Sequence, residues 1–323
     1  MAFSEVIGQD QAISVLRRSI SMGRVAHAYL FSGIEGCGKR KTALSFVQAV
    51  FCSAEEACGV CPSCKRVAAG QHPDLHILEP DGAFIKIEQV RELQKELAYR
   101  PFEAPKKACI IDGAHKFNAS SGNALLKTLE EPPGDALMIL IAPERAAVLQ
   151  TIQSRCQSLP FQPLSQEAIE KRLELDGIAP AAARIAATLS AGSLKRALEI
   201  TSQGALGGRR EFLERVFSLS LTDIAPLLAL AEECAGNKEG IPELIELLLS
   251  FLRDILLFDA TPEGVANADL AELVAREAQG LGKTSVMELI EQLMALRGAM
   301  NRNVNARLAF EVFFMKLAAA KRG

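Results

Sequence analysis

Residues 26–39 read AHAYLFSGIEGCGK. The first eight form an apolar run that ends in glycine, which predicts a buried strand followed by a tight turn. The last seven match the pattern G-x-x-x-x-G-K, and residues 41–52 after them have helical character. A strand, a glycine-rich loop and a helix in this order bring backbone N–H groups and a helix N-terminus to a phosphate group. The segment therefore predicts a phosphate-binding loop that uses Gly33, Gly36, Gly38 and Lys39; the alternative is a glycine-rich turn that holds no ligand.

The runs that flank this segment predict an α/β domain with a parallel sheet. Residues 74–80, 107–112 and 136–142 are further short apolar runs, and residues 87–100 have helical periodicity and are followed by proline. Short, nearly continuous apolar strands separated by helices are typical of a parallel sheet that is covered on both faces. Residues 1–163 are therefore expected to form this domain.

The rest of the chain reads as helical. Segments rich in alanine, leucine and glutamate fill residues 164–205 and then residues 206–323, and a glycine-rich stretch at 202–210 has the character of a linker. We expect a small helical domain followed by a larger, separate one.

The composition excludes several classes of protein. The 323 residues are 49% apolar and 23% charged, unlike disordered or collagen-like chains. The net charge of -3 argues against a free-standing nucleic-acid-binding protein, so any DNA contact is expected to be local or shared with partners. The sequence shows no signal peptide, no uninterrupted apolar span and no cysteine spacing of a secreted disulfide domain, so we expect a cytoplasmic protein.

The predicted phosphate-binding loop lacks partners that ATP hydrolysis requires. The position after Lys39 normally carries a serine or threonine whose hydroxyl holds Mg²⁺, but here it is Arg40. A predicted strand ends in Asp112, which could hold Mg²⁺ through water, but the next residue, Gly113, cannot orient an attacking water. A later strand ends in Ala142 and a proline, where a polar side chain is expected. We interpret the site as degenerate; for Asp112 alone, the alternative is a capping or turn residue.

Four of the eight cysteines are clustered within residues 52–64. They are Cys52, Cys58, Cys61 and Cys64. A C-x2-C step lets a tight turn present two sulfur atoms to one metal, and Zn²⁺ takes four such ligands in a tetrahedron. Four thiolates leave no position for water, so we expect a structural zinc ion; the alternative is four free thiols.

Further segments extend the pattern over most of the chain. They are VIGQ at 6–9, NALLKTLEEPP at 123–133, SRC at 154–156, GSLKRAL at 192–198 and NVNARLAFE at 303–311. Together with the loop and the cysteines, they resemble the clamp-loader branch of the AAA+ proteins of bacterial DNA replication. The resemblance implies an AAA+ P-loop domain with an inserted zinc module, a helical lid over 164–205 and an oligomerising helical collar over 206–323.

The resemblance implies a role for the degenerate site. In this family the gamma and tau subunits hydrolyse ATP, whereas delta-prime subunits of DNA polymerase III often carry a degraded site. The departures above, and a chain that stops at residue 323, favour the delta-prime branch. The chain would then lack an ATPase activity of its own while being a component of the polymerase holoenzyme, a DNA-directed DNA polymerase. Its implied partners are the gamma/tau and delta subunits, the sliding clamp and, through the assembled hetero-oligomer, primed DNA; no membrane partner is implied, and whether the loop keeps ATP or ADP stays open.

The resemblance also implies roles for single residues. In the family the arginine of SRC, here Arg155, reaches the ATP site of the neighbouring subunit and stabilises charge on the transferred phosphoryl group. The alternative for Arg155 taken alone is a surface salt bridge, which is the commoner role of an arginine near a strand end. Lys195 or Arg196 matches the sensor-2 position of the lid. The helix in NALLKTLEEPP ends in Glu130 and Glu131, whose charge opposes the helix dipole and hints at a functional or interface role, with simple solvation as the alternative.

Two other functional hypotheses stand beside this one. The first is an active gamma-like ATPase subunit, in which unidentified side chains compensate for Arg40 and Gly113. The second is a stand-alone, zinc-stabilised nucleotide-binding regulator unrelated to replication. Basic residues that could touch DNA are equally ordinary surface charges and stay unassigned: Lys65, Arg66, Lys106 and Lys107.

Overall fold

The computed structural model describes residues 3–54, 57–202, 208–237, 240–258, 260, 265, 267–300 and 305–321. The chain divides into two compact units. The first comprises Met1–Ala168 and Gly192–Lys195, and the second comprises Ile169–Ala191 and Arg196–Gly323. The division into residues 1–163, 164–205 and 206–323 stays a prediction. Parts of the linker at 202–210 and of the segment at 303–311 lie outside the described residues.

The first unit is built on a five-stranded parallel sheet in the order β2-β3-β4-β1-β5. Its strands are β1 (Ala28–Ser32), β2 (Leu75–Leu78), β3 (Ala108–Asp112), β4 (Leu137–Ala142) and β5 (Gln157–Pro160). Every residue of β1 and β4 is buried, as their unbroken apolar sequences require. Because β1, β3 and β4 are adjacent, their carboxyl ends meet at one edge of the sheet, where ligands bind in open α/β folds.

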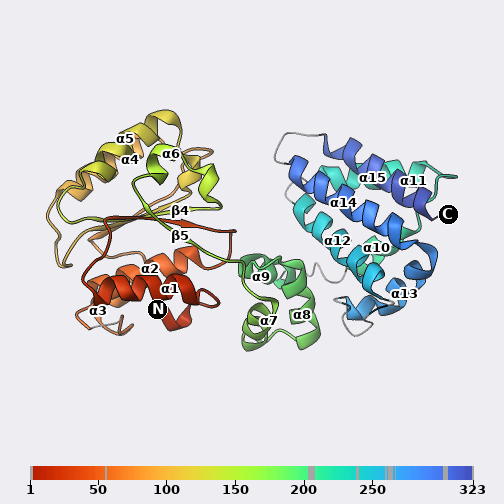
Figure 1. The fold of residues 1–323 in the computed structure, drawn as a ribbon, viewed down its shortest axis with the longest axis horizontal. Helices are drawn as coiled ribbons and strands as arrows, with labels where there is room; N and C mark the ends of the chain where they lie inside the picture. Colours follow the sequence, from red (N-terminus) through yellow and green to blue (C-terminus); the bar gives the residue numbers. More distant parts are fainter. Residues whose placement is uncertain are drawn as a thin grey trace. The chain divides into compact units, whose positions relative to one another are not determined.

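Helices cover both faces of this sheet (Figure 1). On one face lie α1 (Asp10–Ser21), α2 (Lys39–Phe51) and α3 (Pro62–Ala68), which pack with Tyr29 and Phe31 of β1 into one core cluster. The other face carries α4 (Ile87–Ala98), α5 (Ala119–Glu130) and α6 (Gln150–Gln153). Short 3-10 turns complete the unit at Phe3–Glu5, Ala114–Lys116 and Arg145–Ala147. Alternate residues of each strand therefore serve two separate cores.

The remaining elements are helical. In chain order they are α7 (Gln166–Leu175), α8 (Pro180–Leu189), α9 (Leu194–Ser202), α10 (Arg209–Phe217), α11 (Ala225–Gly236), α12 (Ile241–Leu257), the 3-10 turn η6 (Ala268–Leu270), α13 (Ala271–Gly280), α14 (Lys283–Met300) and α15 (Ala306–Ala320). The helices from α10 onward share one apolar core, in which Phe251, Phe310 and Phe314 are fully buried.

The structure confirms the predicted fold class. The strands expected at 26–33, 74–80, 107–112 and 136–142 are β1 to β4, and the elements described after β5 are helices. Strand β5 was not predicted, because its sequence QSLP is short and only half-buried. Among the helices of the described residues, none combines the length and apolarity needed to cross a lipid bilayer.

Candidate functional site

The predicted phosphate-binding loop lies between the end of β1 and the start of α2. Gly38 caps α2 with a left-handed backbone (φ 102°), and Lys39 is the first helical residue. The Lys39 side chain lies within the loop: its Nζ donates to the carbonyl oxygen of Gly33, and to that of Ile34 at 2.6 Å. Lys39 is buried, and this burial lowers its pKa. The loop therefore surrounds its own cation with backbone carbonyl groups.

Residues 192–195 pack directly against this loop. Gly36 has a φ of 77°, and a Cβ atom there would lie 2.2 Å from Ser193 Oγ, so this approach requires glycine. The Leu194 N–H donates to the Gly36 carbonyl at 3.1 Å. Lys195 Nζ lies 2.6 Å from Glu35 Oε1, and this contact lowers the pKa of Glu35. Of the two sensor-2 candidates, Lys195 therefore contacts the loop, through its ammonium group.

Arg40 occupies the position of the missing hydroxyl ligand, and its guanidinium group contacts two carboxylates. Nη1 donates to Asp112 Oδ2 at 3.2 Å and also to Glu79 Oε1. Thr42 does not substitute for the hydroxyl, because its Oγ1 donates to the Gly38 carbonyl at 2.9 Å. A fixed cation thus lies against the carboxylate that was expected to hold Mg²⁺.

The backbone after Asp112 also departs from a hydrolytic arrangement. Gly113 has a φ of 99°, in the left-handed region, and its N–H donates to the Ile141 carbonyl at 3.1 Å. A Cβ atom there would lie 3.0 Å from Pro80 Cγ. A glutamate at this position would be strained by both features. Ala142 ends β4 fully buried and brings no polar side chain to the site.

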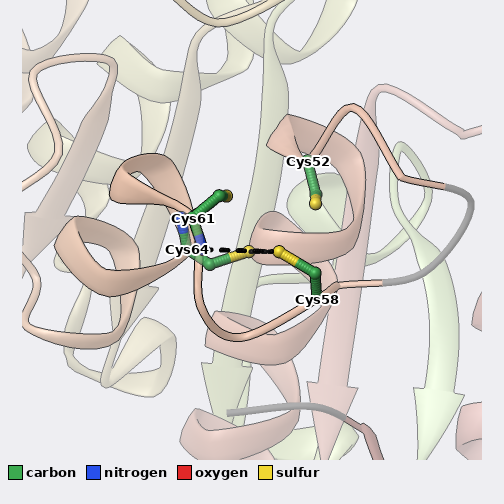
Figure 2. Close-up of side chains that lie close together, drawn as sticks. All are labelled: Cys52, Cys58, Cys61 and Cys64. Carbon is green, nitrogen blue, oxygen red and sulfur yellow. Dashed lines mark hydrogen bonds between the residues drawn. The ribbon is translucent and has the colours of Figure 1, made fainter.

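The four clustered cysteines converge on one point (Figure 2). Cys52 follows α2, Cys58 lies in the connecting loop, Cys61 caps α3, and Cys64 lies in the first turn of α3. All four sulfur atoms lie within 4.8 Å of one another, and the Sγ atoms of Cys58 and Cys64 are 4.0 Å apart. A tetrahedral Zn²⁺ with bonds of roughly 2.3 Å needs sulfur separations of about 3.8 Å. The donor set therefore fits zinc after a shift of less than about 1 Å.

Backbone amides favour the thiolate form of Cys58. The Cys61 N–H lies 3.4 Å from Cys58 Sγ, and the Cys64 N–H lies 3.4 Å from Cys61 Sγ. Hydrogen bonds from the Cys61 and Val60 amides lower the pKa of Cys58 to about 6. Thiolates are the form that binds metal. The C-x2-C turn from Cys58 to Cys61 thus supplies two sulfur atoms and, at Cys58, the backbone dipoles that favour the thiolate.

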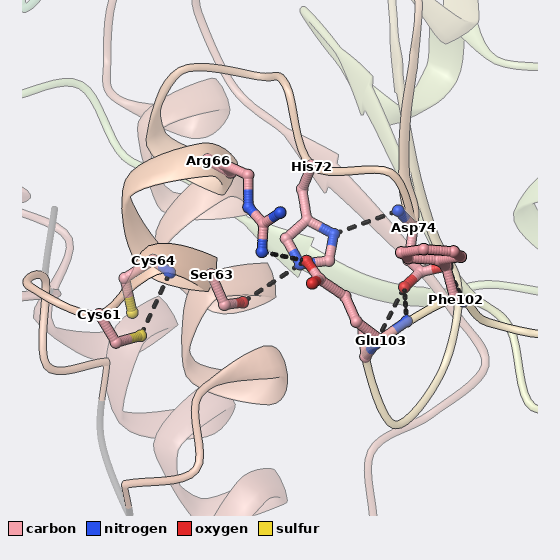
Figure 3. A network of polar contacts seen from close by, with 9 residues as sticks. Cys61, Ser63, Cys64, Arg66, His72, Asp74, Phe102 and Glu103 are labelled. Atoms are coloured by element: carbon pink, nitrogen blue, oxygen red, sulfur yellow. Dashed lines mark hydrogen bonds and ion pairs between the residues drawn. The ribbon is translucent and has the colours of Figure 1, made fainter.

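A polar network connects this cysteine module to the loop that follows α4 (Figure 3). The buried ring of His72 lies between Ser63 Oγ, 3.2 Å from its Nε2, and Glu103 Oε1, 2.9 Å from the same atom. The buried carboxylate of Asp74 accepts the backbone N–H groups of Phe102, Glu103 and Ala104 at 2.6 to 2.9 Å. The loop backbone is therefore held even though the Phe102 side chain is 83% exposed.

Arg155, the candidate arginine finger, lies just after α6 and contacts the end of α5. Its Nε donates to Glu130 Oε1 at 2.9 Å, and its Nη2 contacts the same oxygen atom. Its Nη1 donates to the Thr151 carbonyl at 2.9 Å. The Arg155 side chain remains 33% exposed. The guanidinium group is thus oriented by its own subunit while part of it faces solvent.

Comparison with known proteins agrees with these features. The family model described as DNA polymerase III, delta subunit, matches residues 8–165, and the model for the C-terminal part of that same subunit matches residues 203–318. The DNA polymerase III subunit delta' of Bacillus subtilis is 32% identical over 322 residues, which cover 96% of each chain. The delta' subunit of Pseudomonas aeruginosa is 33% identical over 91% of this chain and 92% of its own.

The chain belongs to the DNA polymerase III delta' subunit family. The tau subunit of Escherichia coli is also similar, with 30% identity over 98% of this chain but only 54% of its own. A solved gamma subunit-related protein of Thermotoga maritima shares the fold, with a TM-score of 0.50 at 18% identity, over 96% of this chain and 100% of that chain. The predicted resemblance to clamp-loader AAA+ proteins is thereby confirmed.

For this family member, the structure adds residues that sequence analysis did not single out as site residues. Gln9, in the segment VIGQ, is buried, and its Nε2 donates to the Cys37 carbonyl at 3.0 Å and the Gln162 carbonyl at 2.7 Å. Glu79 contacts Arg40, and Ser193 contacts the Gly36 position. The motif VIGQ was the available signal for Gln9; the others depend on tertiary contacts that spacing does not encode.

Three of the four basic residues that were left unassigned for DNA contact are either paired within the chain or buried. Arg66 contacts Glu103, Lys106 Nζ lies 2.7 Å from Asp135 Oδ2, and Lys107 is buried. These placements favour ordinary structural charges over a DNA-binding patch.

Proposed function

We propose that this chain serves as the delta-prime subunit of a bacterial clamp loader, as a hydrolysis-deficient AAA+ scaffold. The observation that carries the proposal is the contact of the Arg40 guanidinium group with Asp112. A cation fixed there competes directly with Mg²⁺ for the only carboxylate of the pattern. Gly113 leaves no base, and its left-handed backbone disfavours the glutamate that would restore one. These features disfavour the gamma-like ATPase alternative.

In this role, Arg155 acts on the nucleotide of a neighbouring gamma/tau-type subunit. Phosphoryl transfer builds charge on the oxygen atoms of the transferred group, and a guanidinium fork can donate hydrogen bonds to two of them. Arg155 would supply such a charge from outside the ATP-binding subunit, which would explain how a chain with a degenerate site contributes to turnover. The replication role places the chain in the bacterial cytoplasm.

The cysteine module supports the same scaffold. Cys52, Cys58, Cys61 and Cys64 would hold one Zn²⁺, which supplies a structural crosslink and no reaction chemistry because thiolates fill all four positions. The crosslink would join the end of α2 to α3. Since α2 begins in the phosphate-binding loop, the metal site and the degenerate nucleotide site share one helix.

The C-terminal helices supply a surface for assembly. Exposed apolar residues recur at seven-residue spacing on α14, at Met287 and Met294, and at helical spacing on α15, at Leu308, Val312 and Met315. Such spacing lines up side chains along one face of each helix. We assign these faces to contacts with the helical domains of the delta and gamma/tau subunits, which then carry the clamp and primed DNA together with this chain.

The assignment of Arg155 is tested in the assembled complex. The complex is reconstituted with the gamma/tau-type and delta subunits of the same organism and assayed for ATP hydrolysis stimulated by clamp and primed DNA. Arg155→Ala should leave assembly intact on gel filtration and slow hydrolysis at the adjacent site by about 10³-fold, the lower end for arginine fingers. Unchanged hydrolysis would remove the trans role of Arg155.

A further inference from the structure

The end of helix α5 carries a charge that its own helix does not favour. Glu130 is the last residue of α5, and Glu131 caps it, where the partial negative charge of the helix terminus disfavours carboxylates. A carboxylate at this position therefore carries a local electrostatic cost. The structure shows the contact that Glu130 makes, which is with Arg155.

The geometry of that contact fixes the whole guanidinium group. One carboxylate oxygen, Glu130 Oε1, receives both Nε and Nη2, while Nη1 donates to the Thr151 carbonyl at 2.9 Å and lies 3.3 Å from Ser154 Oγ. Contacts on both edges leave the planar group with one orientation. These contacts use four of the five N–H bonds of the guanidinium group and leave one, on Nη2, for an incoming acceptor.

Stability does not explain this arrangement. Glu130 is 50% exposed and Arg155 is 33% exposed, and ion pairs at such positions contribute little to folding. The adjacent Glu131 has the same charge and sequence environment yet contacts no part of Arg155 in the contacts that the described residues make. The two glutamates therefore differ in that only Glu130 orients the arginine.

We propose that Glu130 is the positioning residue of the arginine finger. It orders the Arg155 side chain within its own subunit before the neighbouring triphosphate arrives, so that less rotamer freedom is lost in the transition state. The inference rests on the proposed function, because it requires Arg155 to act in trans. It predicts a role for the second half of the motif NALLKTLEEPP that packing of α5 does not supply.

The test compares variants of this chain in the reconstituted clamp loader, with clamp and primed DNA present. Glu130→Ala should lower kcat for ATP hydrolysis by roughly fivefold, with KM for ATP unchanged, because it frees an arginine but removes no nucleotide contact. Glu130→Gln, whose amide oxygen still accepts a hydrogen bond, should restore part of the loss. Glu131→Ala is the matched control and should leave kcat unchanged.

A double variant separates positioning from a general loss of structure. In the Arg155→Ala background, Glu130→Ala should have no further effect, because the residue acts only through the arginine. An equal loss of kcat on Glu130→Ala in both backgrounds would overturn the inference. A rise in kcat would also overturn it, because Glu130 would then restrain the arginine finger instead of positioning it. If Arg155→Ala slows hydrolysis but Glu130→Ala does not, only the positioning role fails. If Arg155→Ala itself has no effect, the proposed function fails and the inference with it.

Discussion

Replacing Asp74 with alanine should destabilise the α/β unit more than any exposed acidic substitution. The Asp74 carboxylate is fully buried and accepts the backbone N–H groups of Phe102, Glu103 and Ala104. Its own N–H donates to His72 Nδ1 at 3.1 Å, so it also joins the network that borders the cysteine module (Figure 3). Removal of one side chain therefore releases the loop after α4 from the residue that precedes β2.

The size of the effect follows from these contacts. A hydrogen bond to a charged group contributes about 1.5–3 kcal/mol, which gives roughly 4.5–9 kcal/mol for the set. The released amides belong to a surface loop and regain hydrogen bonds with water, so the net loss should be about 3 kcal/mol. For a unit of this size, that corresponds to a fall in Tm of about 6–12 °C.

Tyrosine fluorescence provides the assay. The chain has no tryptophan and two tyrosines, Tyr29 and Tyr99, and both lie in the α/β unit, so a thermal melt followed by tyrosine reports that unit alone. Asp81→Ala is the matched control, since this exposed carboxylate pairs only at the surface with Lys86 and its loss should leave Tm unchanged. An Asp74→Ala melt within 2 °C or so of the wild type would refute the anchoring argument.

The pH dependence of the difference in stability between the wild type and Asp74→Ala checks whether that difference is electrostatic. Burial raises the pKa of Asp74, but the hydrogen bonds from the Glu103, Ala104 and Phe102 amides outweigh it, so the net pKa lies below its ordinary value. A carboxyl with a lowered folded-state pKa stabilises the protein above its unfolded pKa, and this contribution is lost as the pH falls through the folded pKa. The stability gap between wild type and Asp74→Ala should be complete near pH 7 and should close only in strong acid.

Two further predictions concern the other sites. Arg40→Ser removes the cation beside Asp112 and supplies a hydroxyl group. Isothermal titration calorimetry should therefore show an affinity for Mg-ATP that is about tenfold higher or more. An unchanged affinity, or an affinity that does not depend on magnesium, would show that Arg40 does not compete with the ion. Purified protein should contain one Zn²⁺ per chain, as measured by atomic emission. Cys58→Ser should lower this zinc content, whereas Cys156→Ser, which lies outside the cluster, should not. Equal zinc content in the two variants would contradict the four-cysteine site.

Local chemistry made much of this molecule predictable. The β1–loop–α2 segment is recognisable because the apolar run, the glycines and the lysine are contiguous. The cysteine cluster is recognisable because its members are separated by short spacings in the sequence. Strand β5 was not predicted because only Leu159 of its four residues is buried, so its sequence contains no apolar run. Its place in the sheet comes from pairing with β1, which lies far away in the sequence.

The contacts that define the degenerate site could not be predicted, for a similar reason. The sequence shows that Arg40 is a cation in the wrong place, but its partners Glu79 and Asp112 are separated from it by 39 and 72 residues. Lys195 and Glu35 are 160 residues apart, and the backbone φ of Gly113 depends on how β3 meets the following turn. Charge and residue type are local properties, whereas the choice of partner is a property of the fold.

Mg-ATP turnover by the purified chain alone tests the central claim most directly. Lys39→Ala serves as the control for contaminating ATPases, because Lys39 is the side chain that the predicted phosphate-binding loop would use for phosphate contact. A chain with Arg40 against Asp112 and no base at Gly113 should show no turnover above that control. Turnover that Lys39→Ala abolishes would contradict the scaffold account and identify the chain as an active motor subunit.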